Sequence, residues 1–252
     1  MKKSLNIIFD IDGLICDPWT RTEKFWKEHS YVPDTLKNFS FERDATDFEM
    51  TNIDKRLRST ILKSLCRPEH YRNPTSMPIA TTKHGFYEHY RPTFTEWCDL
   101  FNELNDHKIM LHTHCLTPRS AEARTEWFNE VIAPASPHVS LKIDTGENKS
   151  ASECDLLFED SIANISRSPA PCRCLIEQFH NSCKSEYNRN IYHNIKNRDF
   201  VIIENNFNDY KTAVRAAIAF INADTTTTPH IESFLSAFKD MKRNDIKAGR
   251  FY

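Results

Sequence analysis

An acidic pair with one residue between its members, Asp10 and Asp12, directly follows the apolar run Leu5–Phe9. If the chain stays extended there, both side chains point the same way. Two like charges held together are costly unless a cation neutralises them, and carboxylate oxygens are the ligands that Mg²⁺ prefers. The pair therefore indicates a magnesium site. The alternative is a simple turn, because Asp12-Gly13 is a common turn dipeptide.

A second acidic pair, Glu159 and Asp160, follows another apolar run, Leu156–Phe158. The carboxyl ends of parallel strands meet at one edge of a sheet, so this pair and the first one could converge on the same cation. Taken alone, the second pair could equally mark the start of a helix, where acidic residues are ordinary. Two such pairs after apolar runs are harder to attribute to chance.

Two further residues have side chains that could bind a phosphoryl group. Thr113 follows the apolar run Ile109–His112, and its hydroxyl and backbone N–H could bind a phosphoryl oxygen. Lys149 lies eleven residues before Asp160 and could neutralise both a phosphate and an attacking carboxylate. Taken singly, Thr113 could be an ordinary strand-end or helix-cap residue, and Lys149 a solvated surface lysine.

Glycine is scarce, with only four among 252 residues. No two glycines are close enough for a dinucleotide-binding G-x-G-x-x-G or a phosphate-binding G-x-x-x-x-G-K-[ST] loop. A G-x-S-x-G nucleophile elbow is excluded for the same reason. Any phosphate must therefore be held without a glycine-rich loop.

The composition also limits the partners and the compartment. The formal charge of −2 gives no basic excess for a nucleic-acid partner. No apolar run approaches the ~18 residues of a membrane helix, and the N-terminus does not resemble a signal peptide. We therefore expect a cytoplasmic protein in which the eight cysteines are reduced. A zinc site at Cys172, Cys174, His180 and Cys183 remains open, although its spacing is unusual.

Short apolar runs alternate with helical patterns along most of the chain, which predicts an α/β fold. We expect a Rossmann-like, mostly parallel sheet flanked by helices on both faces. The expected strands are Leu5–Phe9, Lys108–His112, His138–Ile143, Asp155–Phe158, Arg173–Phe179 and Phe200–Ile203. The expected helices are Thr93–Asn105 and Pro118–Val131, which lie between strands, and Asn208–Ile221, which follows the last strand.

Residues 18–91 break this alternation, because they contain no convincing strand. Helical patterns at Thr20–His29 and Ala45–Leu65 predict a helical cap over the carboxyl edge of the sheet, where ligands of such sheets bind. Residues 1–17 and 92–223 would then form the α/β core. Residues 224–252 would form a C-terminal extension with one helix, Pro229–Lys242.

Taken together, these residues resemble the four motifs of the haloacid dehalogenase (HAD) superfamily of phosphohydrolases. The motifs are matched in order by Asp10-Ile11-Asp12-Gly13, Thr113, Lys149 and Glu159-Asp160. A cap placed directly after the first motif is also found in one class of that superfamily.

A narrower resemblance is to the 5′(3′)-deoxyribonucleotidase branch, and it covers roughly residues 4–221. Residues 10–17, DIDGLICD, are similar to that branch's DMDGVLAD, and residues 149–160, KSASECDLLFED, have its lysine at the same distance before the acidic pair. The branch has serine after the second-motif threonine, whereas this chain has His114. Pro18, followed by Trp19, stands where the branch has an aromatic residue.

The resemblance implies a Mg²⁺-dependent phosphatase that works in two steps. Asp10 would attack phosphorus to form an aspartyl-phosphate, and Asp12 would protonate the leaving alcohol and then activate water. Mg²⁺ would be held by Asp10, the backbone carbonyl of Asp12, Asp160 and Glu159. The phosphate would be held by Thr113, Lys149 and, less specifically, His114.

The resemblance also implies a small phosphate ester as the partner, namely a nucleoside 5′-monophosphate of the deoxyribonucleotide series. Trp19, Phe25 and Trp26 could stack on the base or could simply pack within the cap. The alternatives are a HAD phosphatase for another small phosphate ester and a catalytically silent nucleotide-binding protein. A homodimer is compatible with either.

Overall fold

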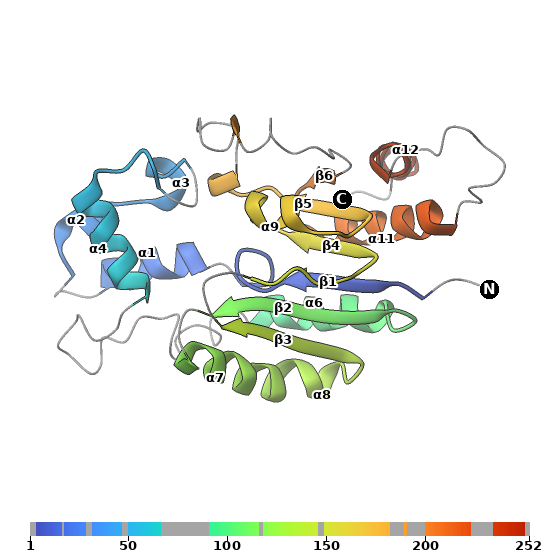
Figure 1. Cartoon of the computed structure of the whole chain (residues 1–252), viewed down its shortest axis with the longest axis horizontal. Coiled ribbons are helices and arrows are strands. Elements are labelled where there is room, and N and C mark those ends of the chain that lie inside the picture. The colour runs from blue at the N-terminus through green and yellow to red at the C-terminus, as the bar shows by residue number, and fades with distance from the viewer. Residues whose placement is uncertain are drawn as a thin grey trace.

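Six parallel strands form a single sheet in the order β3-β2-β1-β4-β5-β6 (Figure 1). The computed structural model describes residues 4–16, 18–28, 32–46, 50–66, 91–115, 118–145, 149–181, 189–190, 200–222 and 234–249. The strands are β1 (Asn6–Asp10), β2 (Lys108–Cys115), β3 (Val139–Thr145), β4 (Leu156–Glu159), β5 (Cys172–Ile176) and β6 (Phe200–Ile203). The expected α/β fold is thereby confirmed, and the described strands are all parallel.

Strands β4 and β5 are buried along their length because both of their faces are covered. All residues of β4 and β5 are buried, as expected for strands in the middle of a parallel sheet. On one face, Phe9 stacks on Phe158 with ring centroids 4.5 Å apart, and Tyr210 meets Phe158 edge to face. The main hydrophobic core lies on this face.

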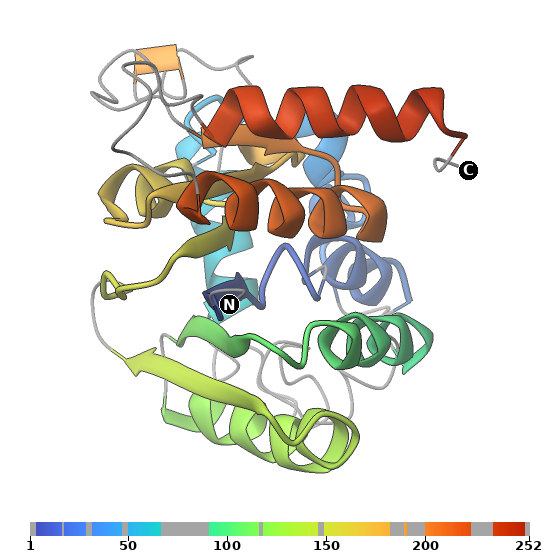
Figure 2. The ribbon, with the colours of Figure 1, turned by 90° about the vertical axis from the view of Figure 1, so that its right-hand side faces the viewer.

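Helices cover both faces of the sheet. The main core is covered by α6 (Arg91–Glu103), α7 (Pro118–Trp127), the π-helical turn η4 (Phe128–Ile132), the short α8 (Ala133–Ala135), α11 (Phe207–Asn222) and α12 (Phe234–Lys247). The opposite face is covered in part by α9 (Ile162–Arg167), which buries Ile162 and Ile165 against a smaller apolar cluster. Figure 2 shows α11 and α12 packed side by side.

The helical segment that follows β1 has a hydrophobic core of its own. It contains α1 (Pro18–Glu28), α2 (Asp34–Lys37), α3 (Phe41–Asp44) and α4 (Lys55–Cys66). Trp26, Phe41 and Ile61 are buried in a cluster that is separate from the main core. Figure 1 shows β2 and β3 running toward this helical segment, so their carboxyl ends face it. The expected helical insert is therefore found up to residue 66, and residues 67–90 lie outside the described part of the chain.

Several element boundaries differ from the expected ones. The predicted helix Ala45–Leu65 is wrong in its first part: α3 ends at Asp44, and the next helix begins only at Lys55. Strand β2 continues to Cys115, three residues beyond the predicted end. The C-terminal helix continues to Lys247 rather than Lys242. None of the described helices has the length and apolar content needed to cross a membrane.

Candidate active site

Three buried carboxylates meet at the carboxyl edge of the sheet. Asp10 is the last residue of β1, Glu159 is the last residue of β4, and Asp160 follows it. One carboxylate oxygen from each lies within 4.8 Å of the others, and the three residues are only 6%, 1% and 7% exposed. The predicted convergence is thus present for three of the four carboxylates, and Asp12 is not part of this group. The helix-start alternative does not account for Glu159, because α9 begins at Ile162 with Ser161 as its N-cap.

Lys149 joins two of these carboxylates. Its Nζ lies 2.9 Å from Asp10 Oδ1 and 2.8 Å from Glu159 Oε2, and its side chain is 7% exposed. The alternative of a solvated surface lysine is therefore wrong. A buried ammonium group at this position can neutralise an anion that approaches Asp10.

The burial of these charges changes their ionisation. Burial, together with the negative charge of Glu159, raises the pKa of Asp10 well above its ordinary value. Burial also raises the pKa of Asp160, and the neighbouring Glu159 adds to this effect. For Glu159, burial acts in the same direction, but the charge and hydrogen bond of Lys149 outweigh it and lower the pKa to about 2. With one lysine beside three carboxylates, this group could hold a further cation.

A tight turn between β1 and the helical insert carries Asp12 and Gly13. The backbone N–H groups of Ile15 and Cys16 both donate to the carbonyl of Ile11, which winds the chain into a single turn. Gly13 has a φ of +86°, and a Cβ atom added to it would lie 1.8 Å from Asp160 Oδ2. Only glycine fits here without displacing a carboxylate of the acidic cluster.

Polar side chains at the ends of other elements hold this turn and Asp160 in place. Gln178 Nε2 donates to the carbonyl of Gly13 at 2.7 Å, and Asn205 Nδ2 donates to that of Leu14 at 3.3 Å. Asn181 Nδ2 donates to the backbone carbonyl of Asp160 at 2.9 Å. The turn is thereby anchored to the segments that follow β5 and β6.

Asp12 belongs to a second group of polar residues beside the carboxylate cluster. Thr113 is buried inside β2 rather than at its end, and its hydroxyl donates to Asp12 Oδ2 at 2.9 Å. Arg124 of α7 donates from Nη2 to the same oxygen at 2.5 Å. The structure therefore brings Thr113 to the predicted site. Arg124 was not predicted, because nothing in its sequence neighbourhood distinguishes it from a surface arginine.

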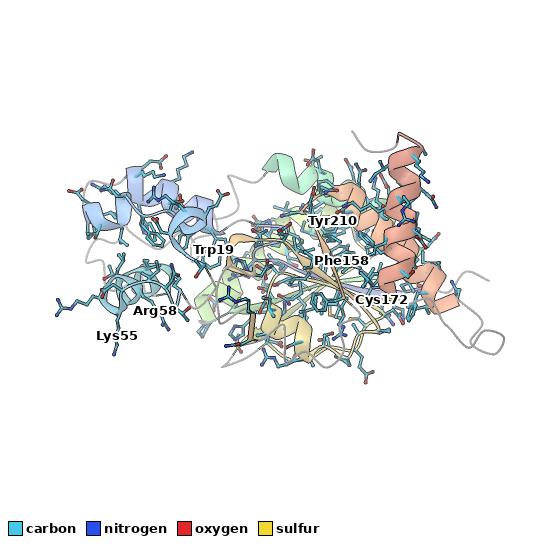
Figure 3. The ribbon with its side chains drawn as sticks, turned by 90° about the horizontal axis from the view of Figure 1, so that it is seen from above. Trp19, Lys55, Arg58, Phe158, Cys172 and Tyr210 are labelled. Atoms are coloured by element: carbon cyan, nitrogen blue, oxygen red, sulfur yellow. The ribbon has the colours of Figure 1, made fainter. Side chains whose placement is uncertain are left out.

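His180 joins the carboxylate cluster to the helical insert. Its Nε2 lies 3.1 Å from Asp160 Oδ2, and its ring centroid lies 5.8 Å from that of Trp19. Figure 3 places Trp19 at the side of the insert that faces the sheet. Trp19 is thus near the site, as the base-stacking hypothesis requires, and it also packs against Phe41 of the insert, as the packing alternative requires.

The other candidate substrate residues do not gather at the site in the same way. Trp26 is 1% exposed and stacks on Phe41 inside the insert, so the packing alternative is the correct one for it. The side chain of Phe25 lies outside the described part of the structure. His114 is half-buried, and strand alternation turns its side chain to the opposite face of β2 from Thr113.

The described residues offer one group that could hold a metal ion, namely Asp10, Glu159 and Asp160. Its donors are all carboxylate oxygens, which suit a hard cation such as Mg²⁺. Nothing in the described residues supports the zinc alternative: Cys172 and Cys174 are buried in β5, and burial raises the pKa of the Cys172 thiol to about 12. Cys183 lies outside the described residues.

In comparisons with known proteins, no family model matches the chain, and no curated protein matches it either.

Proposed function

We propose that this chain is a Mg²⁺-dependent phosphatase of the HAD type that hydrolyses nucleoside 5′-monophosphates, with deoxyribonucleotides as the expected substrates. One observation carries the proposal. Asp10, Glu159, Asp160 and Lys149 come from three segments of the chain and meet at the carboxyl edge of the sheet, next to the turn that carries Asp12. Ligands of open parallel sheets bind at this edge.

The residues present fit a divalent cation. Asp10, Glu159 and Asp160 are buried with too little positive charge beside them, and Asp10 has a raised pKa that a bound cation would lower. Asp10, Asp160 and the backbone carbonyl of Asp12 would hold Mg²⁺, with Glu159 in support. When bound, the ion supplies charge stabilisation for the phosphoryl oxygens.

The chain's own residues then have distinct tasks. Asp10 attacks phosphorus, and the bond from phosphorus to the ester oxygen breaks as Asp12 gives that oxygen its proton. Asp12 next takes a proton from water, whose oxygen attacks phosphorus and releases Asp10 and inorganic phosphate. Lys149, 2.9 Å from Asp10 Oδ1, lowers the cost of bringing an anionic phosphate to an anionic carboxylate.

The nucleotide preference rests on the resemblance to the deoxyribonucleotidase branch and on the position of Trp19. Its ring lies beside His180, which contacts the carboxylate cluster, so a base above the site could stack on it. The nucleotide preference is a narrower claim than the phosphatase activity, so it can be wrong while the phosphatase activity is right.

The experiment is a phosphate-release assay of wild type and Asp10→Asn with Mg²⁺ and with a chelator. The substrates are a panel of ribo- and deoxyribonucleoside monophosphates, sugar phosphates and an activated aryl phosphate. We expect Mg²⁺-dependent turnover by wild type, and a loss of about 10³-fold or more in Asp10→Asn, because covalent attack by carboxylate is then lost.

The outcomes separate the alternatives. Equal, weak rates on all esters would contradict the nucleotide preference and favour a phosphatase for another small ester. If wild type fails to release phosphate even from the aryl phosphate, the catalytic proposal is wrong, and binding of nucleotides without turnover would favour the silent nucleotide-binding protein.

A further inference from the structure

We propose that Arg124 is a positioning residue that, with Thr113, fixes the orientation in which the Asp12 carboxylate meets the substrate. The inference rests on the proposed function, since it assigns a task within that reaction. It concerns a residue on α7 that no motif points to, separated from Asp12 by 112 positions in the chain.

Two donors meet on one oxygen of Asp12. Thr113 Oγ1 donates to Oδ2 at 2.9 Å, and Arg124 Nη2 donates to Oδ2 at 2.5 Å. No described residue donates a hydrogen bond to Oδ1, which is itself shielded from solvent. The two oxygens of this carboxylate therefore have different environments.

This arrangement can hold the carboxylate through both steps of the proposed reaction. An arginine cannot give up its proton, so Arg124 stays a cationic donor throughout. Because Thr113 on β2 and Arg124 on α7 both donate to Oδ2, two elements fix the orientation of the carboxylate.

The guanidinium group of Arg124 is itself held in place, so it can position the carboxylate of Asp12. Its side chain is 7% exposed, and Nη1 lies 3.2 Å from the sulfur of Cys115 at the end of β2. Thr113 is on the same strand, so β2 helps to fix the positions of both donors. A misplacement of about 1 Å in a reacting group can cost roughly 10²-fold in rate.

The test compares Arg124→Met and Arg124→Lys with wild type on two substrates. An alkyl phosphate such as a nucleoside monophosphate has a poor leaving group that needs the proton of Asp12, whereas an activated aryl phosphate leaves without one. The measured quantity is the rate of alcohol or phenol release in a single turnover, because this step precedes the action of water. Arg173→Met is the matched control, since Arg173 is equally buried but donates to the carbonyl of Ile165.

We expect Arg124→Met to slow alcohol release about 100-fold and phenol release less than about 10-fold. Arg124→Lys should restore part of the alcohol-release rate, since it keeps one cationic donor. Arg173→Met should change both rates by the same factor. An equal loss on the two substrates in Arg124→Met, or no loss on either, overturns the inference.

Crystal structures of wild type and Arg124→Met give a second readout that does not depend on activity. We expect the Asp12 carboxylate to rotate or to adopt several orientations in the variant. If it keeps the wild-type orientation, Arg124 does not position it. If wild type proves inactive on every ester, the proposed function fails, yet these structures still decide whether Arg124 orients Asp12.

Discussion

Gly13 shows at the scale of one residue how the missing side chain shapes the site. Its φ of +86° lies in the left-handed region, and the place of a Cβ is taken by the carboxylate of Asp160. Glycine scarcity in this chain excludes glycine-rich phosphate loops, yet one of the four glycines stands where two acidic segments approach most closely. The proposed site therefore depends on one close approach of the backbone at Gly13 rather than on a glycine-rich loop.

We expect Gly13→Ala to lower turnover by about 100-fold or more, because the new methyl group must push Asp160 out of the carboxylate cluster. Gly249→Ala is the matched control. Gly249 also has a positive φ, +66°, but it is exposed after α12. Its alanine variant carries backbone strain of about 1 kcal/mol without contact with a carboxylate. Steady-state turnover and thermal unfolding of both variants check this, and full activity of Gly13→Ala would show that the turn is misplaced.

The sequence allowed the site residues to be predicted only where type and position coincided. Asp10, Glu159 and Asp160 stand directly after apolar strands, so their convergence followed from parallel topology. Arg124 stands in a polar helix among other charged residues, and only the folded chain brings it to Asp12. Trp26 has the residue type of a base-stacking group, but its burial depends on packing that no local pattern reveals.

At the scale of elements, the connection from β3 to β4 carries Lys149 and is fixed by a hydrogen-bond network. Asp144 on β3 accepts from the backbone N–H of Ser150 at 2.6 Å and from its hydroxyl at 2.8 Å. His112 of β2 lies with Nε2 2.7 Å from the same Asp144 oxygen. Burial and the charge of Lys149 lower the pKa of His112, so the neutral ring donates from Nε2 to Asp144. The network therefore fixes Ser150, the residue that follows Lys149.

We expect Asp144→Asn to reduce turnover about 10-fold and to destabilise the fold by about 2 kcal/mol, because hydrogen bonds to a charged group are lost. Asp155→Asn is the control: Asp155 accepts from Asn6 N–H at 2.8 Å at the opposite edge of the sheet, so its loss should affect stability but not turnover. Turnover measurements together with urea unfolding separate the two effects. Equal turnover in the two variants would contradict the positioning of Lys149 by this network.

Asp144→Asn should also change how the stability of the fold depends on pH in acid. Burial raises the pKa of Asp144, but the bonds from Ser150 and His112 outweigh it and lower the pKa from 3.8 to about 2. The ionised group therefore stabilises the fold above pH 3.8, and this contribution is lost as the pH falls through about 2. The stability difference between wild type and Asp144→Asn should shrink over that interval.

Element types were more predictable than element limits. Apolar runs identified all six described strands, and the signal has a clear cause in β4 and β5, which are buried throughout. The end of β2 was missed because the polar residues Thr113 and His114 remain in the strand. Of the segment 45–54, the described residues 45, 46 and 50–54 are not helical although their composition suited a helix, and Met50 is buried there with a φ of +49°.

At the scale of the whole molecule, the C-terminal helix α12 is part of the α/β core rather than an appendage. Phe234, Ala237 and Phe238 are buried in the main hydrophobic core. Polar contacts fix α12 on α11: Lys242 Nζ lies 2.8 Å from Asp209 Oδ2, and Arg215 pairs with Asp245. The helix therefore covers the sheet beside β6. The proposed site residues belong to other elements of the fold.

The Asp209–Lys242 pair provides a test of this role. Asp209 is fully buried, whereas Lys242 reaches it from a position that is 31% exposed. Replacing the lysine leaves a buried carboxylate without its cation, which costs about 3 kcal/mol. We expect Lys242→Met to lower the midpoint of thermal unfolding by about 6 to 12 °C, while turnover measured well below that midpoint stays at the wild-type value.

Lys239→Met is the matched control, because Lys239 is exposed on the same helix. Its midpoint should change by no more than about 2 °C, since surface charges contribute about 0.5 kcal/mol or less. A comparable loss in both variants would mean that α12 responds to net charge rather than to the buried pair. A loss of turnover at low temperature in Lys242→Met alone would mean that α12 influences the catalytic edge, contrary to its placement beside α11 and β6.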